Sequence, residues 1–310
     1  MPDVRTPVRP LLKWAGGKRQ LLPELRPFYP GAFKRYFEPF LGSGAVFLDL
    51  HNLGLLDGRR VCLSDINADI IGCYRAVRDD VDGVIAALLA HDRAYRSAGG
   101  AHFYCVRDEV FNPMRREIHA SSDPAGAYSA PLAAMLIFLN RTGFNGLFRL
   151  NARGEFNVPH GRNSNPRICD VDNLRAWSRI LNRPGVQLDA CPFEAMLERA
   201  GREDFVYLDP PYAPLSGTAR FTSYTAGGFD SVAQARLQRT VIQATARGAS
   251  ILLSNSAAPQ IRALYARDRR ALKAGLHAST VSARRAINSR ASSRGPVREY
   301  LITNVARRSV

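Results

Sequence analysis

The stretch Glu203-Asp-Phe-Val-Tyr-Leu-Asp-Pro-Pro-Tyr212 decides the fold, because it joins a short apolar run to an abrupt stop. The apolar residues before Asp209 are typical of a buried strand. The strand must end at Pro210 and Pro211, since proline lacks the N–H that a sheet ladder needs. In an open α/β sheet, ligands bind at the carboxyl edge, where the strands end. Asp209 to Tyr212 are therefore predicted to lie at an edge where chemistry takes place.

These four residues suit a reaction on the exocyclic amine of a nucleobase. Such an amine is a poor nucleophile, because its lone pair is delocalised into the ring, so a catalyst must hold its hydrogens with acceptors. Asp209 offers a carboxylate and the Pro210 peptide offers a carbonyl, while the ring of Tyr212 can stack on the base. The alternative is a strand that ends in a proline turn and has no catalytic role.

The length and composition are those of a globular protein. With 310 residues, the chain can form one large α/β domain or a domain with a sizeable insertion. It has no run of eighteen apolar residues and no hydrophobic segment at its N-terminus, so we expect a soluble, cytoplasmic protein. Its five cysteines form no C-x-x-C pair, which argues against a zinc site and against a disulfide framework.

The net charge of +16 favours polyanionic partners such as nucleic acid. However, only four of the 43 basic residues are lysine, and a bias toward arginine can also reflect a GC-rich genome. Charge alone leaves both explanations open.

The segment Arg35 to Phe47 predicts a nucleotide-binding half, because an apolar strand runs into a glycine turn at Gly42 and Gly44 and then into a helix that extends to Leu56. Phe47 occupies the position of the third glycine of dinucleotide enzymes, which weakens an NAD or FAD interpretation. A second strand ends at Asp65, about twenty residues further on, where a carboxylate can hold a ribose diol. A strand-end cap is the alternative for this residue.

The N-terminal segment Pro10 to Lys18 combines cations, an indole and two glycines. Gly16 and Gly17 allow the backbone to approach a ligand closely, while Trp14 and Lys18 can meet its aromatic and carboxylate parts. The segment lacks the Walker A pattern, so a phosphate-binding P-loop is not expected. The alternative is a basic turn.

Residues 67–182 differ from their surroundings, with helical patterns at Ile70 to Arg78, Val81 to Tyr95 and Ala125 to Arg141 and a loop rich in Gly, Ser and Asp between them. The segment Phe138 to Arg162 shows no periodicity. Instead it interleaves Arg with Phe, Asn and Gly, which suits insertion between bases, phosphate contact and readout of base edges. A solvated hairpin is the alternative.

The remaining segments return to the sheet. We expect strands at Val186 to Phe193, Ala249 to Asn255, Ala271 to Ser279 and Val297 to Asn304, and a helix at Ser231 to Arg247. The turn Leu215 to Phe229 is long enough to fold over a substrate, and an Arg- and Ser-rich loop is expected at Arg284 to Arg294.

Taken in order, these motifs resemble the Dam-type (D12 class) DNA adenine-N6 methyltransferases, which use S-adenosylmethionine (SAM) and recognise GATC. The resemblance covers nearly the whole chain. The matching blocks are Leu12 to Lys18, Glu38 to Gly44, Ser64 to Asn67, Asn140 to Arg162 and Asp209 to Phe229.

The resemblance implies an α/β fold: a Rossmann-like, seven-stranded methyltransferase sheet, parallel except for one reversed strand, with an inserted, mostly helical DNA-recognition domain. It implies that residues 1–66 and 184–310 form the methyltransferase domain and that residues 67–183 form the insert. The implied substrate is double-stranded DNA, the implied cofactor is SAM, and no metal is needed. We expect a monomer.

The resemblance also implies roles for individual residues. The implied catalytic residues are Asp209, Pro210, Pro211 and Tyr212. The implied cofactor contacts are Trp14, Lys18, Phe40, Gly42, Gly44, Asp65, Phe193 and Asp209. The expected DNA contacts are Lys13, Arg141, Phe144, Asn145, Leu147, Arg149, Asn157 and Pro159. Two positions depart from the family pattern: Phe144 stands where tyrosine is common, and Asn163 replaces an aromatic or polar residue after Gly-Arg.

The expected reaction transfers the methyl group of SAM to N6 of an adenine that is flipped out of duplex DNA. A related alternative is methylation of cytosine N4, although those enzymes more often carry serine at the position of Asp209. A catalytically silent nucleic-acid-binding relative is a second alternative, and a nicotinamide oxidoreductase is a third.

Overall fold

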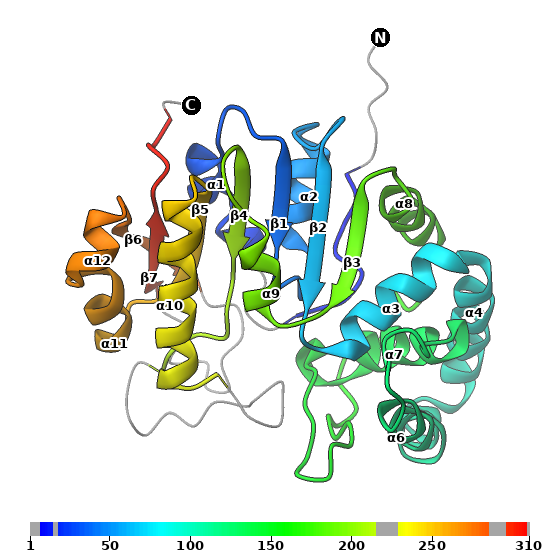
Figure 1. Cartoon of the computed structure of the whole chain (residues 1–310). Helices are drawn as coiled ribbons and strands as arrows, with labels where there is room; N and C mark the ends of the chain where they lie inside the picture. The colour runs from blue at the N-terminus through cyan, green and yellow to red at the C-terminus, as the bar shows by residue number, and fades with distance from the viewer. Residues whose placement is uncertain (1–6, 15–17, 215–228, 285–295, 309–310) are drawn as a thin grey trace. The chain divides into compact units, whose positions relative to one another are not determined.

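The structure, a computed structural model, describes residues 7–14, 18–214, 229–284 and 296–308 (Figure 1). The chain divides into two compact units. The first comprises Met1–Gly17, Gly42–Leu55 and Asn67–Ala190, and the second comprises Lys18–Leu41, Leu56–Ile66 and Cys191–Val310. The expected boundaries of the insert, 67 and 183, stay a prediction.

Seven strands form one sheet in the order β3-β2-β1-β4-β5-β7-β6. The strands are β1 (Arg35–Glu38), β2 (Arg60–Asp65), β3 (Val186–Ala190), β4 (Asp204–Leu208), β5 (Ser250–Ser256), β6 (His277–Arg284) and β7 (Pro296–Thr303). Strand β1 pairs in parallel with β2 and β4, and β4 pairs in parallel with β5, whereas β7 runs antiparallel to both of its neighbours. The expected Rossmann-like α/β sheet with one reversed strand is confirmed.

Strand β4 lies at the centre of the second unit, and all five of its residues are buried. Its register against β1 is fixed at the first pair, where Arg35 donates from Nε and Nη2 to the two carboxylate oxygens of Asp204 at 2.8 and 2.6 Å. The strand ends at Leu208, as the prolines predict. Asp209, the first residue after β4, therefore lies at the carboxyl edge of the sheet, beside the ends of β1 and β5.

Helices cover the sheet of the second unit. Helix α10 (Ser231–Ala246) begins at the cap Asp230, whose side chain accepts from the N–H of Ala233, and packs with α9 (Phe193–Glu198) on β4 and β5 (Figure 1). The shorter elements of this unit are η1 (Lys18–Gln20), α1 (Leu22–Leu25), η2 (Arg26–Phe28), α11 (Pro259–Ile261), η5 (Arg262–Ala266) and α12 (Arg269–Lys273).

The first unit is mostly helical. Its elements are α2 (Ala45–Asn52), α3 (Ala68–Asp79), α4 (Val81–Ala98), α5 (Gly100–Tyr104), η3 (Cys105–Phe111), α6 (Asn112–His119), α7 (Ala130–Thr142), η4 (Phe144–Gly146) and α8 (Val171–Leu181), together with β3. Helix α7 is apolar on nearly every side because it packs against both α3 and α4.

Several sequence predictions were wrong in their boundaries. The strand expected to extend to Phe193 ends at Ala190, because Pro192 caps α9, which begins at Phe193. The helix expected to extend to Leu56 ends at Asn52.

The helix expected from Ala125 begins at Ala130, because Ser129 caps it and Pro131 lies in the first turn, where its missing N–H costs nothing. The segment between α4 and α7 contains α5, η3 and α6 rather than only a loop. Ala271, expected in a strand, lies in α12, and β6 begins at His277.

Some predicted features lie outside the described residues. These are Gly16 and Gly17, the turn 215–228 and the loop 285–294. Among the residues that are described, no helix is long and apolar enough to cross a membrane.

Candidate active site and nucleic-acid interface

Asp209 is held at the end of β4 by two side chains of the second unit. The ammonium of Lys18 lies 2.9 Å from Oδ1, and the hydroxyl of Ser254 donates to the same oxygen at 3.1 Å. Burial raises the pKa of Asp209, and the charge and hydrogen bond of Lys18 oppose that rise. Lys18 is itself almost fully enclosed, with 7% of its side chain exposed. Asp209 is thus a half-buried carboxylate, with 24% of its side chain exposed, and two donors already lie against it.

Tyr212 completes this arrangement. The Nζ atom of Lys18 lies 4.5 Å from the centroid of the Tyr212 ring, so one ammonium contacts both the carboxylate and the aromatic face. The hydroxyl of Tyr212 donates to Oε2 of Glu299 in β7 at 2.7 Å, which fixes the plane of the ring. Burial raises the pKa of Tyr212 well above its usual value, so the phenol stays protonated.

The loop after β4 is fixed by polar side chains from α10 and β5. Gln234 donates to the carbonyl of Pro211 at 2.9 Å, and Asn255 accepts from the N–H of Ala213 at 3.3 Å. The two side chains also bond to each other at 3.1 Å. The Pro211 carbonyl is thus engaged, whereas the Pro210 carbonyl is the one that the sequence assigns to the substrate amine.

Sequence reasoning missed Ser254, Gln234, Asn255 and Glu299. Ser254 and Asn255 had a usable signal, because they lie near the carboxyl end of the strand that pairs with β4. Glu299 is a buried acid within an apolar strand, which is itself unusual.

The second unit also carries three of the expected cofactor residues near the same sheet edge. Phe40 and Phe193 stack with ring centroids 5.5 Å apart, and both rings contact Phe229, at 5.8 and 6.0 Å. Asp65 is the last residue of β2, as expected. The aromatic rings form an apolar wall, and the carboxylate ends a neighbouring strand.

The other cofactor candidates, Trp14, Gly42 and Gly44, belong to the first unit. Both glycines have positive φ values, 47° and 64°. A Cβ atom on Gly42 would come within 2.9 Å of Cδ1 of Trp14, so the indole packs directly on the turn and requires glycine there. Trp14 also stacks on Phe148 at 5.7 Å, and Tyr74, which sequence reasoning missed, donates to the Gly42 carbonyl at 2.9 Å.

Asn140, also missed, ties the N-terminal segment to the turn after α7. Its side chain accepts from the N–H of Lys13 at 2.7 Å and donates to the carbonyls of Lys13 and Gly146 at 2.8 and 3.0 Å. Lys13, expected to contact DNA, is exposed, and partial desolvation of its ammonium and the charge of Arg141 lower its pKa. The structure thus brings Lys13 beside the predicted recognition segment.

Arg141 has a different environment from that expected of a DNA contact. Its Nη2 donates to the carbonyls of Leu11 and Pro10 at 2.8 and 3.4 Å, and burial lowers the pKa of the guanidinium. These contacts make it a tie between α7 and the N-terminal segment. Its expected contact with DNA stays a prediction.

The segment 144–159 forms a turn and a hairpin. Phe144 is 42% exposed, Asn145 is exposed with φ 55°, Leu147 is half-buried and Pro159 is exposed. Across the hairpin, Arg149 donates from Nε to Oδ1 of Asn157 at 2.8 Å and from Nη2 to its carbonyl at 3.1 Å. The expected DNA contacts Arg149 and Asn157 are therefore partners of each other.

Helix α6 holds this hairpin, although sequence reasoning assigned no role to it. Asn112 exchanges two hydrogen bonds with the backbone of Phe156, at 3.1 and 2.8 Å. Arg115 donates to the Gly154 carbonyl and pairs at 2.8 Å with Asp69, whose side chain is fully buried. Although burial opposes it, His119 and Arg115 hold the pKa of Asp69 below its usual range.

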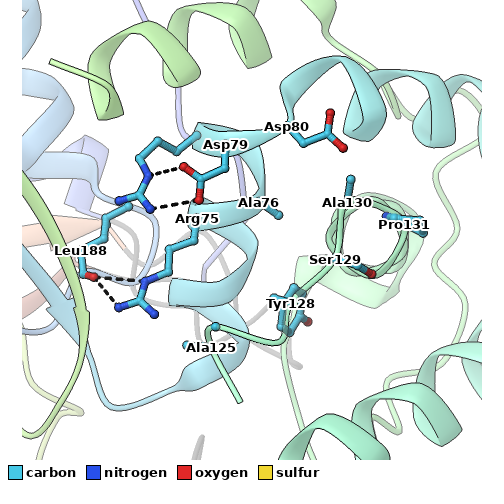
Figure 2. Close-up of a pocket in the computed structure, with 12 residues that line it drawn as sticks. Arg75, Ala76, Asp79, Asp80, Ala125, Tyr128, Ser129, Ala130, Pro131 and Leu188 are labelled. Atoms are coloured by element: carbon cyan, nitrogen blue, oxygen red, sulfur yellow. Dashed lines mark hydrogen bonds and ion pairs between the residues drawn. The ribbon is translucent and has the colours of Figure 1, made fainter. Parts of the chain in front are cut away.

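A hollow between α3 and the start of α7 contains none of the predicted site residues (Figure 2). Its charged side chains are engaged with protein groups: Arg75 donates to the carbonyl of Leu188 at 3.2 and 2.8 Å, and Arg78 pairs with Asp79 at 2.7 Å. None of the candidate catalytic, cofactor or DNA-contact residues lines this hollow.

Comparison with known proteins identifies the family. The family model of the D12 class N6 adenine-specific DNA methyltransferases matches residues 14–286. The chain belongs to this family. This match confirms the resemblance that the motifs indicated. Membership of the family implies that this D12-class protein uses SAM as its methyl donor. The roles of its individual residues stay predictions.

Named relatives of the D12-class protein agree with this assignment. It is 35% identical over 301 residues to the type II methyltransferase M1.LlaDCHI of Lactococcus lactis subsp. cremoris, covering 96% of this chain and 95% of the relative. It is 40% identical over 261 residues to the type II methyltransferase M.MjaIII of Methanocaldococcus jannaschii, covering 80% and 84%. It is also 35% identical over 294 residues to the DNA adenine methylase of Escherichia coli strain K12, covering 94% of each chain.

The residues of the D12-class protein fit SAM. The stacked pair Phe40 and Phe193 offers an apolar surface for an adenine ring, and Asp65 at the end of β2 suits ribose hydroxyls. No group of three or more His, Cys, Asp or Glu side chains within the described ranges could hold a metal ion.

Proposed function

We propose that this protein transfers a methyl group from SAM to N6 of an adenine flipped out of duplex DNA, within the sequence GATC. One observation carries the catalytic part. The ammonium of Lys18 lies against both Asp209 and the face of Tyr212, so this pair already accommodates a nitrogen that carries hydrogens. The N6 amino group of a base stacked on Tyr212 makes the same two contacts.

In this mechanism Asp209 accepts a hydrogen bond from N6, together with the Pro210 carbonyl, and this favours the tetrahedral nitrogen needed for attack. SAM, when bound, supplies an electrophilic methyl group. Gln234 and Asn255 keep the loop in place, and Glu299 fixes the Tyr212 ring on which the base stacks. Because Nζ of Lys18 lies over that ring, Lys18 moves aside when the base enters.

Base flipping is part of the proposal because an adenine that stays paired in the duplex cannot present N6 to the half-buried carboxylate of Asp209. The exposed side chains of Phe144 and Asn145 suit insertion into the duplex, and Arg149 suits readout of a guanine. The names of the relatives support adenine rather than cytosine as the target. We further propose that the enzyme acts as a monomer in the cytoplasm.

The test is incubation of the purified protein with labelled SAM and oligonucleotide duplexes that do or do not contain GATC. The proposal expects label only in GATC duplexes and, after digestion, only in N6-methyladenine. Label in N4-methylcytosine would establish the alternative target, and no label with any duplex would establish a silent relative. A duplex already methylated at both GATC adenines is the matched control and should accept no label.

A further inference from the structure

We propose that Asn157 acts as a positioning residue, which sets the direction from which Arg149 reads guanine. The inference rests on the proposed function, because it assigns to Arg149 the readout of a base within the target sequence. Its basis is the pair of hydrogen bonds from Nε and Nη2 of Arg149 to the side chain and carbonyl of Asn157.

The two bonds select one edge of the guanidinium. Arg149 has five N–H donors in a planar fork, and Asn157 occupies one on Nε and one on Nη2. The end of the fork, formed by Nη1 and the second hydrogen of Nη2, then points away from Asn157. That end carries two parallel donors, which match N7 and O6 of guanine. Asn157 thus leaves the discriminating edge of the fork for the base.

The orientation of the Asn157 amide is fixed by chemistry. Because Nε of arginine can only donate, the atom of Asn157 that faces it must be Oδ1 and not Nδ2. An aspartate at this position can keep that acceptor, whereas alanine or leucine removes it.

The position of Asn157 is fixed by the hairpin. Its N–H donates to the carbonyl of Arg149 at 3.1 Å, so the two residues lie opposite each other. The preceding residue, Phe156, is buried and exchanges two hydrogen bonds with Asn112 of α6. The chain of contacts runs from α6 through Phe156 to Asn157 and ends at Arg149.

This arrangement predicts an effect on specificity rather than on general affinity. A long, unrestrained arginine can contact either a phosphate or a base edge, and only the second contact depends on sequence. An arginine that is held in one orientation before binding also loses less rotamer freedom when it contacts the base. Asn157 should therefore increase the preference for the correct guanine and leave the salt dependence of binding unchanged.

The experiment is a double-mutant cycle with Asn157→Ala, Arg149→Ala and the double variant. For each protein, kcat/KM is measured on GATC and on duplexes in which the guanine pair is replaced. Arg149→Ala should reduce the discrimination ratio by about 5- to 150-fold, as expected for a bidentate guanine contact. In the protein that keeps Arg149, Asn157→Ala should reduce the discrimination ratio at least fivefold. In the Arg149→Ala background, the same substitution should change the ratio less than twofold.

Further variants separate positioning from loss of structure. Asn157→Asp, which keeps the acceptor, should restore the ratio even if its charge raises KM, whereas Asn157→Leu should not restore it. Asn165→Ala, at an exposed asparagine outside the hairpin, is the matched control and should leave the ratio unchanged. Thermal midpoints identify any variant whose loss reflects unfolding.

The outcomes distinguish the inference from the function on which it rests. An equal loss for Asn157→Ala with and without Arg149 would mean that Asn157 contacts DNA itself, and an unchanged ratio in the parent would mean that it positions nothing. Either result overturns the inference. If Arg149→Ala alone leaves discrimination intact while GATC is still methylated, the assignment of Arg149 as the reader fails instead.

Discussion

The proposed catalytic loop, Asp209 to Tyr212, and the hairpin, Arg149 to Asn157, are held in place by different means. The loop follows directly from a buried strand, and its polar partners lie mainly on the neighbouring strands β5 and β7. The hairpin contains an isolated β-bridge between Leu150 and Phe156 and the bonds between Arg149 and Asn157, and side chains of α6 hold it from outside. The proposed catalytic residues are thus held by the sheet, whereas the residues proposed to read the DNA sequence lie in a hairpin that is held by a helix.

The largest effect, a loss of stability, is expected from removing the support that Arg115 of α6 gives to the hairpin. Arg115→Met leaves the fully buried Asp69 without its guanidinium partner, and breaking such a pair typically costs about 3–5 kcal/mol of stability. Chemical denaturation measures the loss. Arg116→Met is the matched control, because the adjacent Arg116 pairs with Glu155 at the surface, where solvent screens the charges, and its loss should change stability far less. Equal effects of the two substitutions would contradict the role given to Arg115.

The same pair gives stability a pH dependence. Because the pKa of Asp69 is lowered in the folded protein, its contribution is complete above the unfolded value of about 4 and is lost as the pH falls through the folded value. Arg115→Met should raise the pKa of Asp69 in the folded protein. Asp69 then contributes less stability above the unfolded pKa, and less is lost on acidification. The free energy of unfolding, measured by chemical denaturation at a series of pH values from neutral to acidic, should therefore fall more steeply for the parent than for the variant.

The next largest effect tests the loop. Asp209→Ala removes the acceptor for N6 and should lower kcat by about 10²- to 10³-fold or more, the range for loss of one group that stabilises a transition state. Folding should persist, because the apolar residues of β4 are untouched. Single-turnover methylation measures the rate, with the exposed Asp172→Asn as control. Near-normal turnover of Asp209→Ala would refute the catalytic assignment.

A smaller effect is expected at the end of β2. Asp65→Ala should weaken binding of SAM by about 1–3 kcal/mol if the carboxylate accepts from ribose hydroxyls. Calorimetric titration with SAM gives the affinity, and binding of DNA without cofactor is the internal control and should barely change. An unchanged dissociation constant for SAM would mean that Asp65 is only a strand-end cap.

The smallest change in rate at neutral pH is expected from removing the positive charge of Lys18. Asp209 must be ionised to act, so kcat/KM should fall as the pH drops through its raised pKa. Lys18→Met removes the ammonium that opposes this rise, which should move the acid limb to higher pH. Lys18→Arg keeps the charge and should leave the limb near its original position. Profiles that coincide for all three proteins would exclude coupling between Lys18 and Asp209.

Much of the fold could be predicted because the signals were local. The ends of β2 and β4 were marked by Asp65 and by consecutive prolines, and the turn after β1 by Gly42 and Gly44. The membership of the D12 class followed from the same motifs.

The supporting contacts could not be predicted because their partners are far apart in the sequence. Tyr212 and Glu299 are separated by 87 residues, Asn140 and Lys13 by 127, and Asn112 and Phe156 by 44. No periodicity or motif connects such positions in a single sequence. For the same reason the sequence did not predict that the guanidinium of Arg141 donates to the backbone carbonyl of Leu11.

The packing of Trp14 on Gly42 gives the protein an internal optical reporter. The chain has two tryptophans, and the other, Trp177, is fully buried and stacked on Tyr74 at 4.8 Å. Trp14 is only half-buried, so a neutral quencher such as acrylamide reaches its emission first. The quenchable part of the fluorescence therefore reports on the surroundings of Trp14, which are the glycine turn and Phe148, and its change on addition of SAM or DNA can be followed in solution without any label.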